Sequence, residues 1–304
     1  MHFDKLLYIN DVVFDPIDAA NLIFSTNVDG TGKAQYHAAC AADFINPFKY
    51  YDTFATRDDQ GNRIGVPIYP WFSDASNTTS RKDVLDQKDA VEVRSCWGGM
   101  VAFNAEWFQP DNFGVANSKM NHNMTSPDQG SSNIYTDRTI IPNTTPPIRF
   151  RASADTFWDA SECCLIHADI EAAVDRAGSL STGIYLNPYI RVAYSSRTLS
   201  LLRLSRRFER LFAPFQKMLG VGLGLPTKNP RRAQEVGHQY EDMVWDYDDA
   251  AWMTTGNVSG GYRKVTRTAL PGGFCGSRKL LVLGEGDDMR EWFNEAVEVP
   301  SSES

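Results

Sequence analysis

An apolar run of strand length ends at two polar side chains very near the start of this 304-residue sequence. The run Leu6–Ile9 stops at Asn10 and Asp11, and the helix that follows begins shortly afterwards. In α/β sheets ligands bind beyond the ends of strands, so this pair is a candidate ligand site. The alternative is a turn in which both side chains bond their own backbone.

A second group of charged side chains falls in the segment 50–63, which the sequence predicts to be an exposed turn. It contains Asp52, Arg57, Asp58 and Asp59. The planar fork of an arginine can hold a phosphate through two hydrogen bonds. The alternative is a run of charges that only meets solvent.

Trp97 stands beside Gly98 and Gly99 in a strand predicted over 91–103, which the two glycines interrupt. Glycines inside a strand allow a ligand or another backbone to approach closely. A tryptophan face is also a standard surface for stacking on a sugar ring. The alternative is a bulge filled by a tryptophan of the core.

Carboxylate, thiol and imidazole groups meet in a helix predicted from about residue 161 to 176. Glu162 falls in its first turn, where a carboxylate is favoured by the free N–H groups. Cys163 and His167 share a face as two metal ligands would, and Cys164 with His167 could form a nucleophilic pair. The alternative is a capped, buried helix with both cysteines in the core.

Composition limits the class of protein. The chain carries a net charge of −8 and has a pI of about 5.2, which argues against a surface for nucleic-acid phosphates. It contains no apolar run of 18 residues, and its first residues do not form a signal peptide. Five cysteines are too few for a disulfide scaffold, and their odd number leaves at least one without a partner in the chain.

Four Asn-x-Ser/Thr sequences predict N-glycosylation and favour a lumenal or secreted protein. The acceptor residues are Asn77, Asn123, Asn143 and Asn257.

The remaining elements follow from periodicity and from helix start signals. Asp15 and Pro16 predict the N-cap and first position of a helix. The buried face expected for that helix consists of Ile17, Ala20, Leu22 and Phe24. Further along the chain we expect an aperiodic loop over 109–147, strands over 36–45, 148–153 and 183–195, a basic helix over 198–217, and a Gly- and Pro-rich part from 220 that ends in a disordered acidic tail.

Several of these stretches occur together in an order that resembles one family. They read LLYINDVVF, YYDTFATRDDQGN, SCWGGMVAF, FRAS…ASECCLIHADI and NPYIRVAY. Over about residues 3–200 the chain resembles glycosyltransferase family 69, the fungal mannosyltransferases related to cryptococcal α-1,3-mannosyltransferase and capsule-associated proteins. Such proteins are type II Golgi membrane enzymes that use GDP-mannose and a divalent metal, Mn²⁺ or Mg²⁺.

The resemblance implies an α/β, GT-A-like nucleotide-diphospho-sugar fold over residues 1–205 and a largely irregular C-terminal extension over 206–304. It also implies mannosyl transfer to a saccharide acceptor, α-1,3 and retaining. Asn10-Asp11 resembles the acidic metal motif of that fold, and carboxylate and amide oxygens suit Mn²⁺ or Mg²⁺. The roles implied are Asp11 as metal ligand, Asn10, Asp43, Asp52 and Arg57 with Asp11 as donor-binding residues, Glu162 as the catalytic carboxylate, and Trp97, Gly98 and Gly99 on the acceptor side.

The metal motif stands much nearer the start of this chain than in the family. We therefore expect an N-terminally truncated protein whose first strand, Leu6–Ile9, is central and buried on both faces, with a membrane anchor only in a full-length form. Two other functions stay open. One is a non-catalytic lumenal module, and the other is a glycosidase that uses Glu162 and a partner Asp.

Overall fold

The protein is represented by a computed structural model built around a mixed, six-stranded sheet. It describes residues 3–73, 78–110, 145–153, 158–175, 181–222, 236–247, 260–278, 280–283 and 292–295. The sheet strands are β1 (Lys5–Ile9), β2 (Ala38–Phe44), β3 (Arg57–Asp58), β4 (Val91–Ser95), β5 (Met100–Asn104) and β7 (Ile184–Ala193). Their order is β1-β5-β2-β7-β4-β3, and β2 with β7 is the parallel pair in it. The predicted α/β class is confirmed.

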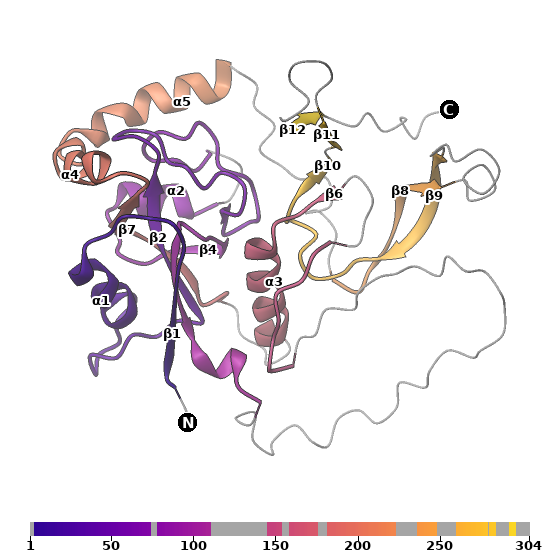
Figure 1. Cartoon of the computed structure of the whole chain (residues 1–304), viewed down its shortest axis with the longest axis horizontal. Coiled ribbons are helices and arrows are strands. Elements are labelled where there is room, and N and C mark those ends of the chain that lie inside the picture. Colours follow the sequence, from indigo (N-terminus) through magenta and orange to yellow (C-terminus); the bar gives the residue numbers. More distant parts are fainter. Residues whose placement is uncertain are drawn as a thin grey trace.

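Helices cover both faces of the sheet (Figure 1). Helix α1 (Pro16–Ser25) packs on one face, where Leu22 joins Met100 of β5. Helix α3 (Glu162–Asp175) covers the other face, where Ile166 joins Phe103 of the same strand. This division follows from the two-residue period of a strand, which sends alternate side chains of β5 to opposite faces.

The start of α1 is as predicted, whereas its predicted buried face is confirmed only at Leu22. Asp15 caps the helix by accepting a hydrogen bond from the Ile17 N–H at 2.9 Å. Ala19 and Leu22 are buried, whereas the side chains of Ile17 and Phe24 are 69% and 65% exposed. Ile17, Ala20 and Phe24 share one face of the helix by their spacing and all are exposed, because α1 packs on the sheet through Ala19 and Leu22.

The expectation that Leu6–Ile9 forms a central strand, buried on both faces, is wrong. Within the described residues β1 lies at the edge of the sheet and pairs with β5 alone. Leu6, Tyr8 and Ile9 are each about 40% exposed. A short apolar run has the same local pattern at an edge as at the centre, because only its distant neighbours distinguish the two.

The strand predicted over 91–103 is interrupted at Gly98-Gly99 as expected, which gives β4 and β5. The strand predicted over 148–153 is absent, since these residues carry no strand pairing. The helix predicted over 198–217 is broken into α4 (Ser196–Ser205), the 3₁₀ turn η2 (Glu209–Phe212) and α5 (Ala213–Gly222). Most of the loop predicted over 109–147 lies outside the described residues.

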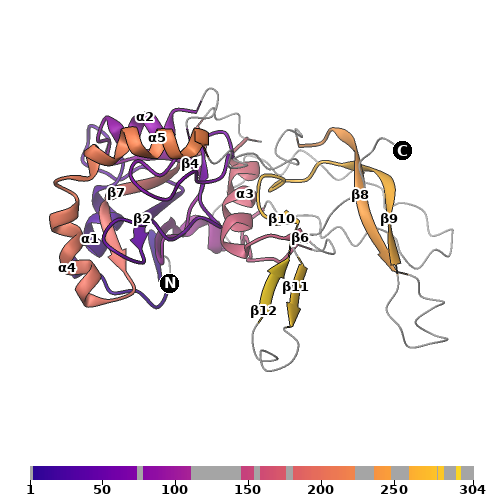
Figure 2. The same ribbon diagram turned by 90° about the horizontal axis from the view of Figure 1, so that it is seen from above.

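Two short helical elements and six strands complete the described chain. They are α2 (Ser80–Leu85), η1 (Ala105–Phe108), β6 (Trp158–Asp159), β8 (Gln239–Tyr247), β9 (Gly260–Thr268), β10 (Ser277–Arg278), β11 (Leu280–Leu283) and β12 (Trp292–Glu295). Both ribbon views place the β8–β9 pair beyond α3, away from the main sheet (Figures 1 and 2). The prediction of a largely irregular extension is therefore wrong for the paired strands β8 and β9.

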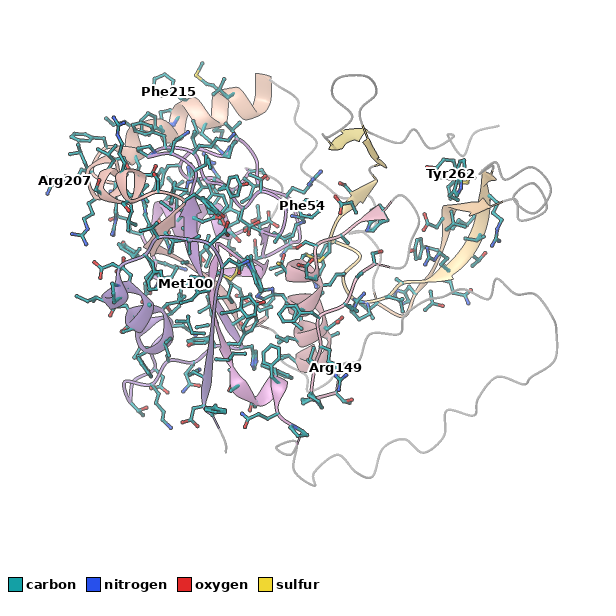
Figure 3. All side chains as sticks on the ribbon, viewed as in Figure 1. Phe54, Met100, Arg149, Arg207, Phe215 and Tyr262 are labelled. Atoms are coloured by element: carbon teal, nitrogen blue, oxygen red, sulfur yellow. A yellow bond between two sulfur atoms is a disulfide. The ribbon has the colours of Figure 1, made fainter. Side chains whose placement is uncertain are left out.

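Residues beyond 205 pack against the first part of the chain through α5 and through the segment around Cys275, among other contacts. Gln216 of α5 is buried and accepts a hydrogen bond from Arg81. A disulfide joins Cys164 of α3 to Cys275, and β10 pairs with β6. The side chains drawn in Figure 3 follow the same arrangement, with Met100 inside the sheet layer and Phe215 on the outer surface of α5. The domain division at residue 205 remains a prediction.

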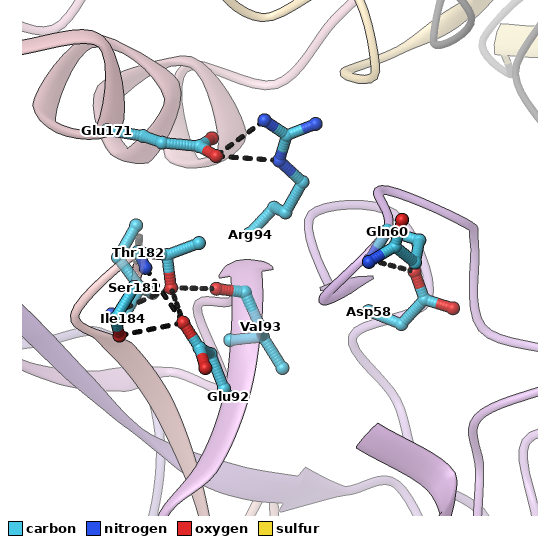
Figure 4. Close-up of polar contacts among 9 residues, drawn as sticks. All are labelled: Asp58, Gln60, Glu92, Val93, Arg94, Glu171, Ser181, Thr182 and Ile184. Carbon is cyan, nitrogen blue, oxygen red and sulfur yellow. Dashed lines mark hydrogen bonds and ion pairs between the residues drawn. The ribbon is translucent and has the colours of Figure 1, made fainter. Parts of the chain in front are cut away.

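Ionic and polar contacts fasten β4 to its neighbours (Figure 4). Arg94 donates two hydrogen bonds to Glu171 of α3, with Nε at 2.7 Å. The Glu92 carboxylate accepts hydrogen bonds from Ser181 and Thr182, just before β7. These contacts fix the position of β4 and of the glycine-containing turn that follows it.

The segment 50–63 is not the exposed turn that the sequence predicts. Arg57 and Asp58 are fully buried and form β3. The Arg57 guanidinium donates to the carbonyl oxygens of Phe54 at 2.7 Å and of Phe274 at 3.0 Å. Burial, with the charge of Arg63, lowers the pKa of Arg57 to about 10. This arginine therefore ties together segments more than 200 residues apart.

Replacing Arg57 by Ala should lower the free energy of unfolding by about 3 kcal/mol, because several buried carbonyl groups lose a charged donor. Urea unfolding followed by circular dichroism measures this. The exposed Arg197→Ala variant is the control and should change the value by less than about 0.5 kcal/mol. If Arg57→Ala is as stable as the wild type, Arg57 does not stabilise the fold, and a role in ligand binding would again be open.

Candidate functional site

The centre of the candidate site is a pair of carboxylates at the C-terminal end of the parallel strands β2 and β7. Asp43 lies in β2 and is 1% exposed. One of its oxygens accepts the N–H of Asp52 at 3.0 Å, and the other accepts the hydroxyl of Tyr194 at 3.0 Å. Tyr194 directly follows β7, so the parallel pairing of β2 with β7 brings the two side chains to one edge.

Burial, together with the negative charge of Asp52, raises the pKa of Asp43 to about 7. The two hydrogen bonds that it accepts lower the pKa but do not offset the burial. Asp43 therefore changes its protonation state near neutral pH.

The Asp52 carboxylate connects this pair to Trp97. One oxygen accepts the N–H of Ala55 at 2.9 Å, which closes the turn 52–55. The other accepts the Thr56 hydroxyl at 2.6 Å and the backbone N–H of Trp97 at 3.0 Å. Asp52 is thus a structural acceptor that holds the tryptophan in place.

Asn10 and Asp11 meet this group from the end of β1. The Asn10 side-chain oxygen accepts the indole N–H of Trp97 at 3.2 Å, and its backbone N–H donates to Gly99 at 2.9 Å. Asp11 is exposed, and its charge contributes, after burial and Asp43, to the raised pKa of Tyr194. The side chain of Asn10 therefore bonds another segment of the chain and not its own backbone.

Gly98 and Gly99 allow the turn after β4 to approach β2 and the segment after β1 closely. Both have positive φ, 58° and 65°. A Cβ on Gly98 would overlap the carbonyl oxygen of Ala41, and one on Gly99 would overlap Val12. A disulfide between Cys96 and Cys40 of β2 fastens the same turn one residue before Trp97.

Three aromatic rings, those of Tyr8, Trp97 and Phe150, contact one another beside Asn10. The ring of Trp97 lies 5.1 Å from Tyr8 and 6.0 Å from Phe150, measured between centroids. Tyr8 and Phe150 are 42% and 41% exposed. Trp97 also packs on the core, as the alternative of a core tryptophan predicts, and its role as a binding surface stays a prediction.

The first turn of α3 borders the same region. Trp97 and Cys163 both pack on the cluster that contains Ala55 and Phe274. Burial, with smaller contributions from the charges of Glu162 and Asp52, raises the pKa of the Cys163 thiol to about 12. Glu162 itself is exposed, which places its carboxylate at the rim of the site and outside the hydrogen-bonded group.

Sequence reasoning therefore named most residues that the fold brings together, namely Asn10, Asp11, Asp43, Asp52, Trp97, Gly98 and Gly99. Arg57 is not at this surface, because its guanidinium is held by backbone carbonyls inside the protein. Tyr194, Tyr8 and Phe150 were missed. The position of Tyr194 directly after a strand predicted over 183–195 is the signal that could have identified it.

Two predictions for the cysteines of α3 are wrong. Cys164 is bonded to Cys275, so it cannot form a nucleophilic pair with His167. His167 meets the carbonyl oxygen of Cys163 at 2.7 Å through Nδ1 and does not meet its thiol. Burial lowers the pKa of His167 to about 4. Cys163 is free among the described cysteines, as the odd count predicts.

The residues at the end of β1 suit a hard cation. Asp11 offers an exposed carboxylate without a hydrogen-bond donor among the described residues, and the Asn10 amide oxygen is beside it in the sequence. These oxygens do not form a complete site alone. Within the described residues, three acidic, His or Cys ligands converge within 4.8 Å only at Cys40, Cys96 and His167.

Comparison with known proteins settles the family. Residues 1–169, more than half of the chain, match the family model described as cryptococcal mannosyltransferase 1. The chain belongs to this family. No curated protein and no solved structure gives a match.

The family membership confirms the resemblance to fungal mannosyltransferases that the motifs predict. In the part of the chain that the structure describes, no helix is both long and apolar enough to cross a membrane. The four predicted glycosylation sites, Asn77, Asn123, Asn143 and Asn257, lie outside the described residues.

Replacing Gly98 by Ala should lower the free energy of unfolding by more than about 2 kcal/mol, because the new methyl group meets a backbone carbonyl at a positive φ. Thermal unfolding measures the change. Gly30→Ala is the matched control, since nothing lies within 4 Å of a Cβ there. Equal stability of the two variants would contradict the close approach of Gly98 to β2.

The raised pKa of Asp43 predicts a pH dependence of stability. Between the ordinary carboxyl pKa of 3.8 and the folded value of about 7, the folded chain binds more protons than the unfolded chain. The stabilisation is therefore complete below about pH 4 and is lost as pH rises to 7. Replacing Asp43 by Asn should remove a change of unfolding free energy across this pH range on the order of 4 kcal/mol.

Urea unfolding of the wild type and of Asp43→Asn at several pH values between 4 and 8 tests this. The difference in unfolding free energy between the two proteins should change with pH. The exposed Asp89→Asn variant should follow the wild type at every pH. A constant difference between wild type and Asp43→Asn would show that Asp43 titrates normally.

Proposed function

We propose that this protein transfers mannose from GDP-mannose to a saccharide hydroxyl, in an α-1,3 linkage with retention and with Mn²⁺ or Mg²⁺. Family membership supports the mannosyltransferase activity. The single observation that carries the assignment of the site is the contact of Asn10 with Trp97, which unites the end of β1 with the Asp43–Asp52 pair.

Asp11 and Asn10 would hold the cation, because they are the exposed oxygen ligands at this edge. The bound cation would neutralise the charge of the departing diphosphate. Asp43 and Asp52 would position Tyr194 and Trp97 in the site by accepting hydrogen bonds from them.

The exposed rings of Tyr8 and Phe150, with Trp97 between them, give a surface on which a sugar ring can stack. Glu162, at the rim, is the carboxylate that we assign to the anomeric carbon. It acts as the nucleophile or stabilises the positive charge of the transition state.

The proposal also includes a lumenal location in the Golgi. Its support is the pair of disulfides, Cys40–Cys96 and Cys164–Cys275, since such bonds persist in oxidising compartments.

Replacing Asp11 by Ala should abolish Mn²⁺-dependent release of GDP from GDP-mannose, with a loss of at least about 100-fold, because an exposed cation ligand is removed. The fold should be unaffected, since the side chain is exposed. Asp89→Ala, another exposed carboxylate, is the control and should keep full turnover.

Unchanged, metal-dependent turnover by Asp11→Ala would remove this residue from the site. Wild-type protein that binds GDP-mannose without turning it over with any saccharide acceptor would favour the non-catalytic lumenal module.

A further inference from the structure

The disulfide beside the candidate site has a third potential ligand next to it. The sulfur atoms of Cys40 and Cys96 and one ring nitrogen of His167 all lie within 4.8 Å of one another. All three side chains are fully buried. They come from three separate elements, which are β2, the turn before Trp97, and α3.

The hydrogen bond of His167 fixes the tautomer of its ring. Its Nδ1 meets a carbonyl oxygen, which can only accept, so Nδ1 carries the proton. Nε2 then has the lone pair. This atom is buried and has no hydrogen-bond partner among the described residues. A buried polar atom in this state is uncommon and calls for a function.

We propose that Cys40, Cys96 and His167 form a Zn²⁺ site that is filled when the Cys40–Cys96 disulfide is reduced. Two thiolates and one imidazole are ligands that Zn²⁺ accepts, with Zn–S near 2.3 Å and Zn–N near 2.0–2.1 Å. In the oxidised chain the two sulfur atoms are bonded at 2.03 Å, and all three ligand atoms lie within 4.8 Å of one another. Reduction releases the two sulfur atoms to move apart, as two Zn–S bonds require, with the imidazole already beside them.

The electron and proton balance of the two states is simple. A dithiol or phosphine reductant supplies two electrons, the S–S bond breaks, and two thiols form. Zn²⁺ then displaces the two thiol protons to solvent. A water molecule would complete the four ligands, which leaves the charge of the site unchanged.

Charge balance favours this ion in a dry interior. Two thiolates cancel the charge of Zn²⁺, so the filled site is neutral among the apolar side chains of the core. Phe103 packs on the His167 ring, with 5.4 Å between centroids, and helps to hold its orientation.

The two states fasten the same turn by different bonds. The disulfide joins Cys96 to β2, whereas the metal would join both to α3 as well. The turn that carries Trp97 is therefore held in the reduced chain too, including the time before the disulfide forms. This inference does not depend on the proposed transferase activity.

Zinc titration of the whole chain tests the proposal. The protein is reduced with a phosphine, desalted without oxygen and titrated with Zn²⁺ against a chromophoric chelator, and Co²⁺ is used in parallel for its thiolate charge-transfer band. We expect one ion per reduced chain and none per oxidised chain.

His167→Phe keeps a ring in the core and removes one ligand, so its affinity for Zn²⁺ should fall at least tenfold. Cys163→Ser is the matched control, because that thiol is free and adjacent on α3, and it should bind Zn²⁺ as the wild type does. Circular dichroism of each oxidised variant verifies its fold.

Site mapping by alkylation makes the test independent of the variants. Zn²⁺ should slow labelling of Cys40 and Cys96 and leave labelling of Cys164 and Cys275 unchanged. The proposal is overturned if the reduced chain binds no zinc, if protection falls on Cys164 and Cys275, if Cys163→Ser abolishes binding, or if Cys40–Cys96 resists reduction while the chain stays folded.

Discussion

The hydrogen bonds accepted by the carboxylates of Asp43 and Asp52 are the contacts on which this edge of the sheet depends. Asp43 receives an N–H from Asp52 and a hydroxyl from Tyr194, and Asp52 receives an N–H from Trp97. Through Trp97 the same network reaches Asn10 at the end of β1. Five segments of the chain thus meet around two carboxylates, and burial raises the pKa of one of them, Asp43, to about 7.

This arrangement separates the residues that build the site from those that can meet a substrate. Asp43 and Asp52 use their oxygens on donors of the protein itself. Asp11, Tyr8 and Phe150 are exposed. In the proposed site the outer residues would bind the cation and the sugar, while the hydrogen bonds of the inner pair hold the segments that carry them.

The sequence predicts this edge of the sheet well, because its signals are local. Each of these signals can be recognised within a few residues: an apolar run that ends at Asn10-Asp11, two glycines after Trp97, and an acidic first turn in α3. What the sequence could not show depends on distant partners. Arg57 is buried because Phe274 supplies a carbonyl 217 residues away, and β1 is an edge strand because β5 is its neighbour. Nor can spacing alone pair Cys40 with Cys96.

In the proposed site, Asn10, Asp11 and Trp97 lie together where a cation and a nucleotide sugar would bind. Paramagnetic Mn²⁺ tests it directly, because it broadens NMR signals of nearby protons. In the presence of GDP-mannose, Mn²⁺ should selectively broaden the indole N–H signal of Trp97, assigned with Trp97→Phe, and leave the buried indole of Trp71 sharp. Equal broadening of the two signals, or none at Trp97, would contradict the account.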